Sequence, residues 1–75
     1  MASWLLSGFS SDDSYGDRVP DWEGDAAGSL DDATLRAREW LRDQPTGACV
    51  EVIADEGRSA RVVRVVTSTS EEDIA

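Results

Sequence analysis

The sequence of 75 residues contains no histidine and no lysine, and its only cysteine is Cys49. Without histidine, neither a Cys/His nucleophile pair nor a zinc site is expected, and one cysteine cannot close an intramolecular disulfide bond. The lack of lysine excludes Schiff-base chemistry and leaves general-base catalysis to carboxylates or to Tyr15. No Gly-rich phosphate-binding motif and no G-x-S-x-G motif occurs. We therefore expect a non-catalytic protein without a cofactor or metal.

Long apolar runs are also lacking. No stretch approaches the roughly 20 apolar residues that a membrane-spanning helix needs. The first residues, MASWLL, lack the basic start of a secretory signal peptide, and Ala2 stands where myristoylation requires glycine. These observations predict a cytoplasmic protein that does not bind membranes.

Positive charge is scarce. The chain contains sixteen acidic residues and seven arginines, which gives a formal net charge of −9. Because binding of free nucleic acid depends on lysine and arginine that neutralise phosphates, direct binding to DNA or RNA is not expected. Electrostatic attraction favours a basic protein as the partner instead. Adaptation of a housekeeping protein to high salt is an alternative origin of the acidity.

Hydrophobic residues make up 40% of the chain and include three tryptophans, so one small folded domain is expected. The sequence divides into four segments. Residues 1–9 are predicted to supply a strand, and residues 10–28, rich in Ser, Asp and Gly, a long acidic loop or disordered segment. Residues 29–67 are predicted to form a core of one helix and a β-hairpin, and residues 68–75 an acidic tail.

The helix is predicted over residues 30–43. Ser29 is a suitable N-cap, and Asp32 at the third helical position is close to a capping box. Pro45 ends the helix. Leu35 lies off the apolar face and is a candidate contact residue. That face is formed by Leu30, Ala33, Ala37, Trp40 and Leu41.

The hairpin is predicted from residues 48–54 and 60–66, which are rich in β-branched residues and flank a turn at 55–58. Pairing Ala54 with Ser59 sets a register that places Val52 opposite Arg61. The predicted fold class is α+β, with the helix packed on the hairpin. Residues 3–9 are expected to add an edge strand, which gives the order β-α-β-β. An uncovered sheet edge would be open to a partner or to a second copy of the chain.

Acidity is concentrated outside this core. Residues 10–32 hold eight acidic residues and one arginine, whereas residues 33–70 hold five acidic residues and six arginines. Carboxylates with aromatic rings between them suit sites built for phosphates and stacked bases, although an acidic loop can equally be a solvated linker. The candidate partner-binding residues are Asp12, Asp13, Tyr15, Asp17, Asp21, Trp22, Glu23 and Asp25.

The spacing of Asp21, Glu23 and Asp25 matches the first three ligand positions of an EF-hand loop. However, Ala26 stands where that loop needs glycine, and Asp32 stands where it needs glutamate. Calcium binding is therefore not expected.

The plan of short strand, polar loop, single helix and hairpin is similar in layout to very small proteins of phages and mobile elements. This similarity implies an inhibitor, such as an anti-CRISPR protein or another nucleic-acid mimic, that occupies the basic surface of a nucleic-acid-binding protein. The alternative is an antitoxin-like or adaptor subunit whose thin core is completed by a partner at a hydrophobic or edge-strand interface. A homo-oligomer is compatible with either hypothesis.

Overall fold

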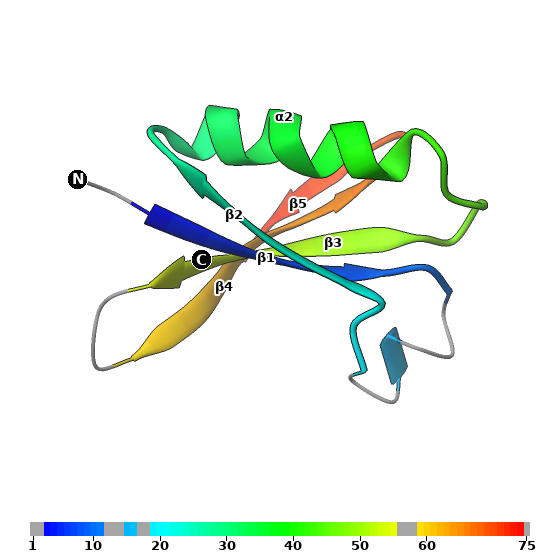
Figure 1. Cartoon of the computed structure of the whole chain (residues 1–75), viewed down its shortest axis with the longest axis horizontal. Coiled ribbons are helices and arrows are strands. Elements are labelled where there is room, and N and C mark those ends of the chain that lie inside the picture. Colours follow the sequence, from blue (N-terminus) through cyan, green and yellow to red (C-terminus); the bar gives the residue numbers. More distant parts are fainter. Residues whose placement is uncertain (1–2, 12–14, 17–18, 56–58, 75) are drawn as a thin grey trace.

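The computed structural model describes residues 3–11, 15–16, 19–55 and 59–74. One helix lies on one face of a five-stranded antiparallel sheet (Figure 1). In chain order the elements are β1 (Ser3–Phe9), β2 (Trp22–Ala27), α2 (Leu30–Leu41), β3 (Cys49–Asp55), β4 (Ala60–Thr67) and β5 (Glu71–Asp73). The strand order in the sheet is β2-β1-β3-β4-β5. The predicted small α+β domain is confirmed, with two strands more than expected.

Helix α2 begins with the capping box that the sequence indicates. The Ser29 hydroxyl accepts a hydrogen bond of 3.2 Å from the Asp32 amide, and the Asp32 carboxylate accepts one of 3.0 Å from the Ser29 amide. The helix ends at Leu41, two residues earlier than predicted, with Arg42 as its C-cap. Among the described residues, no helix has the length and apolar character needed to cross a membrane.

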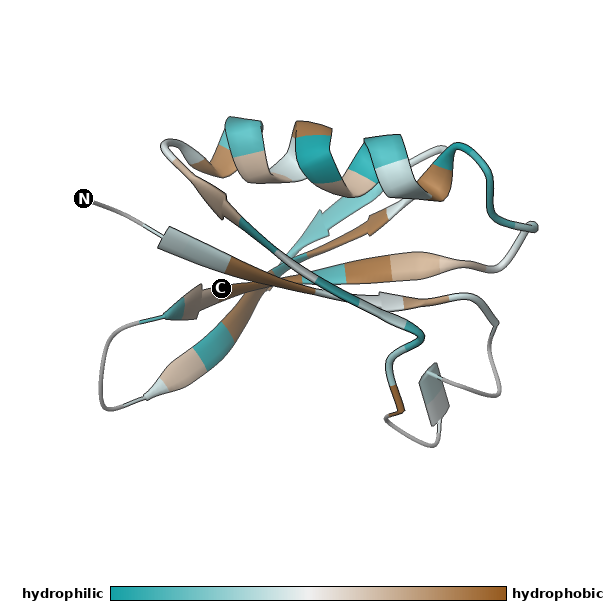
Figure 2. Ribbon diagram, viewed as in Figure 1, coloured by the Kyte–Doolittle hydropathy of each residue, from teal (hydrophilic) through white to brown (hydrophobic). Residues whose placement is uncertain are grey.

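The hydrophobic core lies between α2 and the sheet. Ala33 and Ala37 are fully buried, and their small side chains allow the helix to lie close to the strands. The sheet contributes Leu6, Val50, Val52 and Val66 to this core. Figure 2 shows hydrophobic residues in the middle of β1 and along much of β3, whereas β5 is hydrophilic. Each fully buried aliphatic side chain contributes about 1.5–3 kcal/mol, so a core of this size holds a small domain together.

Strand β1 lies inside the sheet, so the prediction of an edge strand at residues 3–9 is wrong. It pairs with β2 on one side and with β3 on the other. Its side chains are apolar on both faces, as expected of an interior strand. Leu6 packs towards α2, and Phe9, which is 2% exposed, lies on the opposite face.

Residues 22–27 form the edge strand β2, although the sequence predicted a loop there. The strand pairs with β1 over its whole length, for example Glu23 with Ser7. Trp22 and Ala26 pack against the core under α2. The indole of Trp4 donates a 3.0 Å hydrogen bond to the Gly28 carbonyl and so fixes the end of β2. Tertiary contacts therefore stabilise a strand whose own residues have little β-propensity.

The predicted hairpin is present, but its predicted register is wrong. Val52 pairs with Arg64 rather than with Arg61, and Ala54 pairs with Arg61 rather than with Ser59. The register shifts after Val52, where a bulge leaves Val63 as an extra residue on β4. The alternation of residues along a strand contains no signal for such a bulge, so the register could not be predicted from it.

The bulge places Arg64 under α2, where it holds β5 to the rest of the fold. Its side chain is 11% exposed. It donates hydrogen bonds of 3.0 Å to the Thr34 hydroxyl and 2.6 Å to the Asp73 carboxylate, and lies 3.8 Å from Asp31 and Glu71. The hydrogen bond to Arg64 lowers the pKa of Asp73 below its ordinary value. Residues 71–73, predicted to belong to an acidic tail, are thus an ordered strand.

Candidate functional site

The face of the sheet that α2 does not cover is here called the open face. Helix α2 lies on the other side of the sheet (Figure 1), and on the open side the Tyr15 ring packs on Phe9. Because side chains alternate along each strand, the register defines which residues point outwards. The open face includes the buried residues Phe9, Cys49 and Glu51 and the more exposed residues Leu5, Ser7, Glu23, Asp25, Ile53, Val62, Val65, Thr67 and Glu72.

One transverse row of this face contains three glutamates. In order across the five strands, the row is Glu23, Ser7, Glu51, Val65 and Glu72. Glu23 and Glu72 are exposed at the two margins, about 19 Å apart at the usual spacing between strands. Glu51 lies in the middle and is only 4% exposed. Acidic side chains therefore mark both margins of the open face.

The row beside these glutamates is apolar. In the next row, Leu5 on β1 stands beside Ile53 on β3, which is followed by Val62 on β4. Leu5 is 41% exposed, which is high for a leucine in an interior strand. An exposed apolar area with polar margins is the arrangement typical of protein interfaces.

The acidic residues of the two faces differ in their ion pairs. Glu71 lies 3.2 Å from Arg38, and Asp73 lies 2.6 Å from Arg64, so the acids on the helix side are neutralised within the fold. By contrast, no ion pair within the described residues involves Glu23, Asp25 or Glu72. Among the described residues, the carboxylates of Glu23, Asp25 and Glu72 on the open face therefore lack the counter-charges that Glu71 and Asp73 have on the helix side.

The structure separates the eight candidate residues. Asp12, Asp13 and Asp17 lie outside the described residues. Glu23 and Asp25 point outwards from β2 and belong to the open face. Asp21 is exposed at the start of β2, where its carboxylate accepts hydrogen bonds of 2.8 Å from the amide and the hydroxyl of Ser10.

Trp22 lies on the helix side of β2 and does not share a surface with Glu23 and Asp25. Its ring stacks on Trp40 with a centroid separation of 5.3 Å, and the Arg36 guanidinium lies 5.3 Å from its centroid. This position gives Trp22 a packing role in the fold.

Tyr15 lies at one end of the open face. Its ring meets Phe9 edge to face, with centroids 5.1 Å apart and an interplanar angle of 86°. It therefore covers the buried Phe9 and forms a wall at that end of the sheet. Of the five described candidates, Tyr15, Glu23 and Asp25 are placed where a partner on the open face would meet them.

Asp21 directly precedes β2, and Glu23 and Asp25 follow it along the strand instead of surrounding an ion. In the described part of the chain, no group of three or more His, Cys, Asp and Glu side chains is arranged to hold a metal ion. These carboxylates alternate with Trp22 and Gly24, and such a period of two indicates a strand. The prediction of a loop over residues 10–28 did not take this alternation into account. That reading also missed the contributions of Leu5, Ile53 and Glu72.

Comparisons of this chain with protein-family models, with curated proteins and with solved structures gave no match.

Proposed function

We propose that this protein binds a basic partner protein through its open face. The proposal is carried by one observation: Glu23, Asp25 and Glu72 lie at the margins of a face that exposes apolar side chains at Leu5 and Ile53, and they have no ion pair among the described residues. Lysines and arginines of a partner would supply the missing counter-charges, and apolar side chains would cover Leu5 and Ile53. A net charge of −9 adds long-range attraction to such a partner.

The row of carboxylates along β2 favours a nucleic-acid-binding protein as this partner. Glu23 and Asp25 occupy alternate positions of β2, and such residues lie about 6.8 Å apart on an extended strand. This repeat is similar to that of successive phosphates along an extended nucleic-acid strand. A surface whose arginines bind phosphates in series would therefore fit the row. In this proposal the protein is an inhibitor that occupies that surface in place of nucleic acid.

The proposal is tested by affinity capture with matched variants. The wild-type chain, the double variant Glu23→Gln/Asp25→Asn and the control Glu39→Gln/Asp43→Asn are immobilised and exposed to lysate of the source organism. Both variants lose two charges, but Glu39 and Asp43 are exposed on α2 and just beyond it, away from the open face. Bound proteins are released in steps of rising salt and identified by mass spectrometry.

We expect a nucleic-acid-binding protein that the wild type and the control retain to the same salt concentration and that the Glu23→Gln/Asp25→Asn variant releases earlier. Exposed ion pairs are screened over about 10 Å at 0.1 M salt, so release at moderate salt is expected. Purified wild-type chain should also displace nucleic acid from the captured protein. Equal retention by all three chains would overturn the proposal.

A second candidate function follows from the apolar row at Leu5 and Ile53 alone. A hollow of about 210 Å³ lies on the open face between Leu5, Ile53 and Glu23. An adaptor-like or antitoxin-like subunit would bind there mainly through apolar burial. Its complex would survive high salt and would be broken by Leu5→Ser, whereas Glu23→Gln/Asp25→Asn would have little effect.

A further inference from the structure

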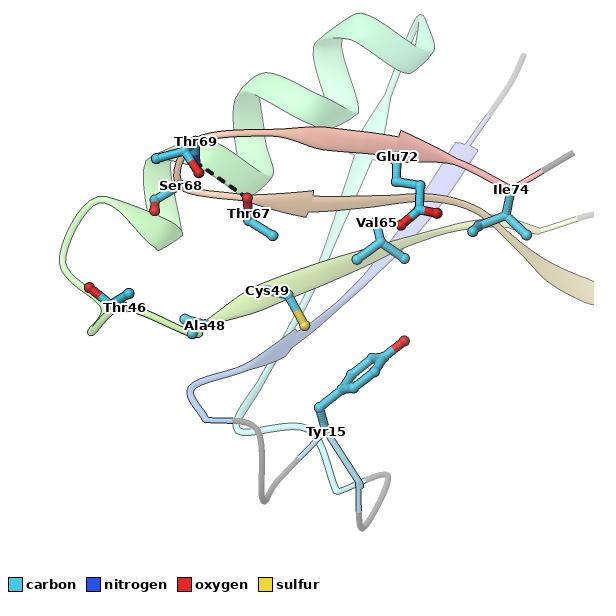
Figure 3. A pocket seen from close by; sticks show the side chains of 11 residues that line it. Tyr15, Thr46, Ala48, Cys49, Val65, Thr67, Ser68, Thr69, Glu72 and Ile74 are labelled. Atoms are coloured by element: carbon cyan, nitrogen blue, oxygen red, sulfur yellow. Dashed lines mark hydrogen bonds between the residues drawn. The ribbon is translucent and has the colours of Figure 1, made fainter.

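The open face carries a groove beside its Glu72 margin. The groove has a volume of about 530 Å³ and is bounded by Tyr15 on one side and by β4 and β5 on the other (Figure 3). Cys49 and Val65 line its floor, and Glu72 and Ile74 line the wall opposite Tyr15. Its volume lies within the range of sites that enclose small ligands or side chains.

Most of the groove is apolar, and Glu72 is the one charged residue among the described residues that line it. Figure 3 shows the Glu72 carboxylate beside Val65 and Ile74, with the phenol of Tyr15 directed into the same space. The wall formed by Tyr15 is supported from behind by the edge-to-face contact with Phe9. The groove thus presents a carboxylate, an aromatic ring and an aliphatic floor close together.

We propose that this groove receives an arginine side chain of the basic partner. This inference rests on the proposed function and names the anchor that the open face would recognise. The aliphatic stem of the arginine would lie along Val65 and Ile74, and its guanidinium would pair with the Glu72 carboxylate. A planar guanidinium forms paired hydrogen bonds with a carboxylate and stacks on aromatic rings such as that of Tyr15, which favours arginine over lysine.

Other occupants fit the groove less well. An anionic ligand would meet the Glu72 carboxylate, and none of the described lining residues is basic. A neutral apolar ligand would remove water from that carboxylate and leave it without a counter-charge, which is costly. A second copy docked face to face would bring the acidic margins at Glu23 and Glu72 against carboxylates of the same kind, and their repulsion opposes such a dimer.

The experiment is a titration of the ¹⁵N-labelled full chain, followed by amide chemical shifts. The probe is the peptide acetyl-Gly-Leu-Arg-Leu-Gly-amide. Its control is the same peptide with citrulline in place of arginine, which keeps the shape and removes the charge. We expect shift changes centred on Cys49, Val65 and Glu72. The citrulline peptide should bind about tenfold more weakly, because a charged hydrogen bond contributes roughly that factor.

Variants identify the groups responsible. Glu72→Gln should abolish the difference between the arginine and citrulline peptides, whereas Glu39→Gln, the same change on the exposed side of α2, should preserve it. Tyr15→Phe should keep most of the affinity because the ring remains, and Tyr15→Leu should lose it. The dispersion of the amide spectrum shows directly whether each variant is folded.

Equal binding of the two peptides by the wild type would overturn the inference. Shift changes confined to β2 would also overturn it, and so would self-association of the chain that buries the groove. The lysate capture with Glu23→Gln/Asp25→Asn depends on the other margin of the open face. If that variant still releases its partner early, the proposed function stands even when the groove fails. If capture shows no dependence on Glu23 and Asp25, the proposed function fails irrespective of the peptide result.

Discussion

Trp22 on the edge strand β2 stacks on Trp40 of α2, with ring centroids 5.3 Å apart and ring planes within 10° of parallel. Gly8 on β1 lies directly against this pair: a Cβ atom there would come within 2.9 Å of the Trp40 ring and 3.0 Å of the Trp22 ring. The stack closes one end of the core and links β2 to the helix. The position of the outward residues Glu23 and Asp25 therefore depends on the contact that Trp22 makes on the other face of β2.

Replacing Trp22 by alanine should destabilise the protein strongly. Truncation of a packed tryptophan costs about 3–5 kcal/mol, and the effect at Trp22 should lie near the lower end because the ring is only half buried. Urea unfolding followed by circular dichroism measures the loss. Val19→Ala, at an exposed position, is the control and should change stability little. An unchanged midpoint for Trp22→Ala would show that the stack does not hold β2 in place.

The substitution Gly8→Ala should also destabilise the fold, although alanine has the better propensity elsewhere. The added methyl group would force the two tryptophan rings apart, and such overpacking costs about 1–3 kcal/mol. Gly16→Ala is a matched control, since a Cβ atom at Gly16 meets nothing within 4 Å. Thermal unfolding of the two variants should separate them, and equal melting temperatures would contradict the close packing at Gly8.

Removal of the helix cap by Ser29→Ala should cost about 1 kcal/mol, because the Asp32 amide would lose its acceptor. Ser68→Ala, at an exposed position, serves as the comparison. Chemical unfolding gives both values, and hydrogen exchange in the first turn of α2 should become faster only in the Ser29→Ala variant. A stability equal to that of Ser68→Ala would mean that the capping box contributes nothing.

Stability should fall in acid partly through Asp73. Since the bond from Arg64 lowers the pKa of Asp73 below its ordinary 3.8, the folded state prefers the carboxylate form. The stabilisation is therefore fully present above pH 3.8 and is lost as the pH falls through the lower pKa of the folded state. Asp73→Asn should be less stable than the wild type at pH 6, and the difference should shrink by pH 2. A difference independent of pH would contradict this assignment.

Local signals allowed the helix to be predicted well. The capping box at Ser29 and Asp32, and the apolar stripe over Ala33 and Ala37, depend only on residues close in sequence. The helix–hairpin core could be predicted for the same reason. In contrast, strand β5 consists of acidic residues only, and it is ordered because Arg64 and Arg38 neutralise two of them. Prediction of β5 would require the position of Arg64. That position is set by the bulge in β4, which no local sequence pattern reveals.

The candidate site could be predicted only in part. The concentration of acidic residues near Glu23 and Asp25 was visible in the sequence, and the structure places both on one exposed face. Trp22 was predicted to belong to the same surface, but side chains alternate along a strand and Trp22 lies on the helix side. Glu72 was missed as part of this surface, since its placement beside Val65 depends on the pairing of β4 with β5.

Because α2 packs on a single face of the sheet, the helix-side residues of a strand and its outward residues are under separate constraints. Trp22, Gly24 and Ala26 must satisfy the packing against the helix, whereas Glu23 and Asp25 can change without altering it. A lineage that must follow changes in a partner's surface can therefore do so by single substitutions at outward positions, with little loss of folding. For the same reason, a library randomised at Leu5, Glu23, Asp25 and Ile53 offers a route to retarget this small scaffold.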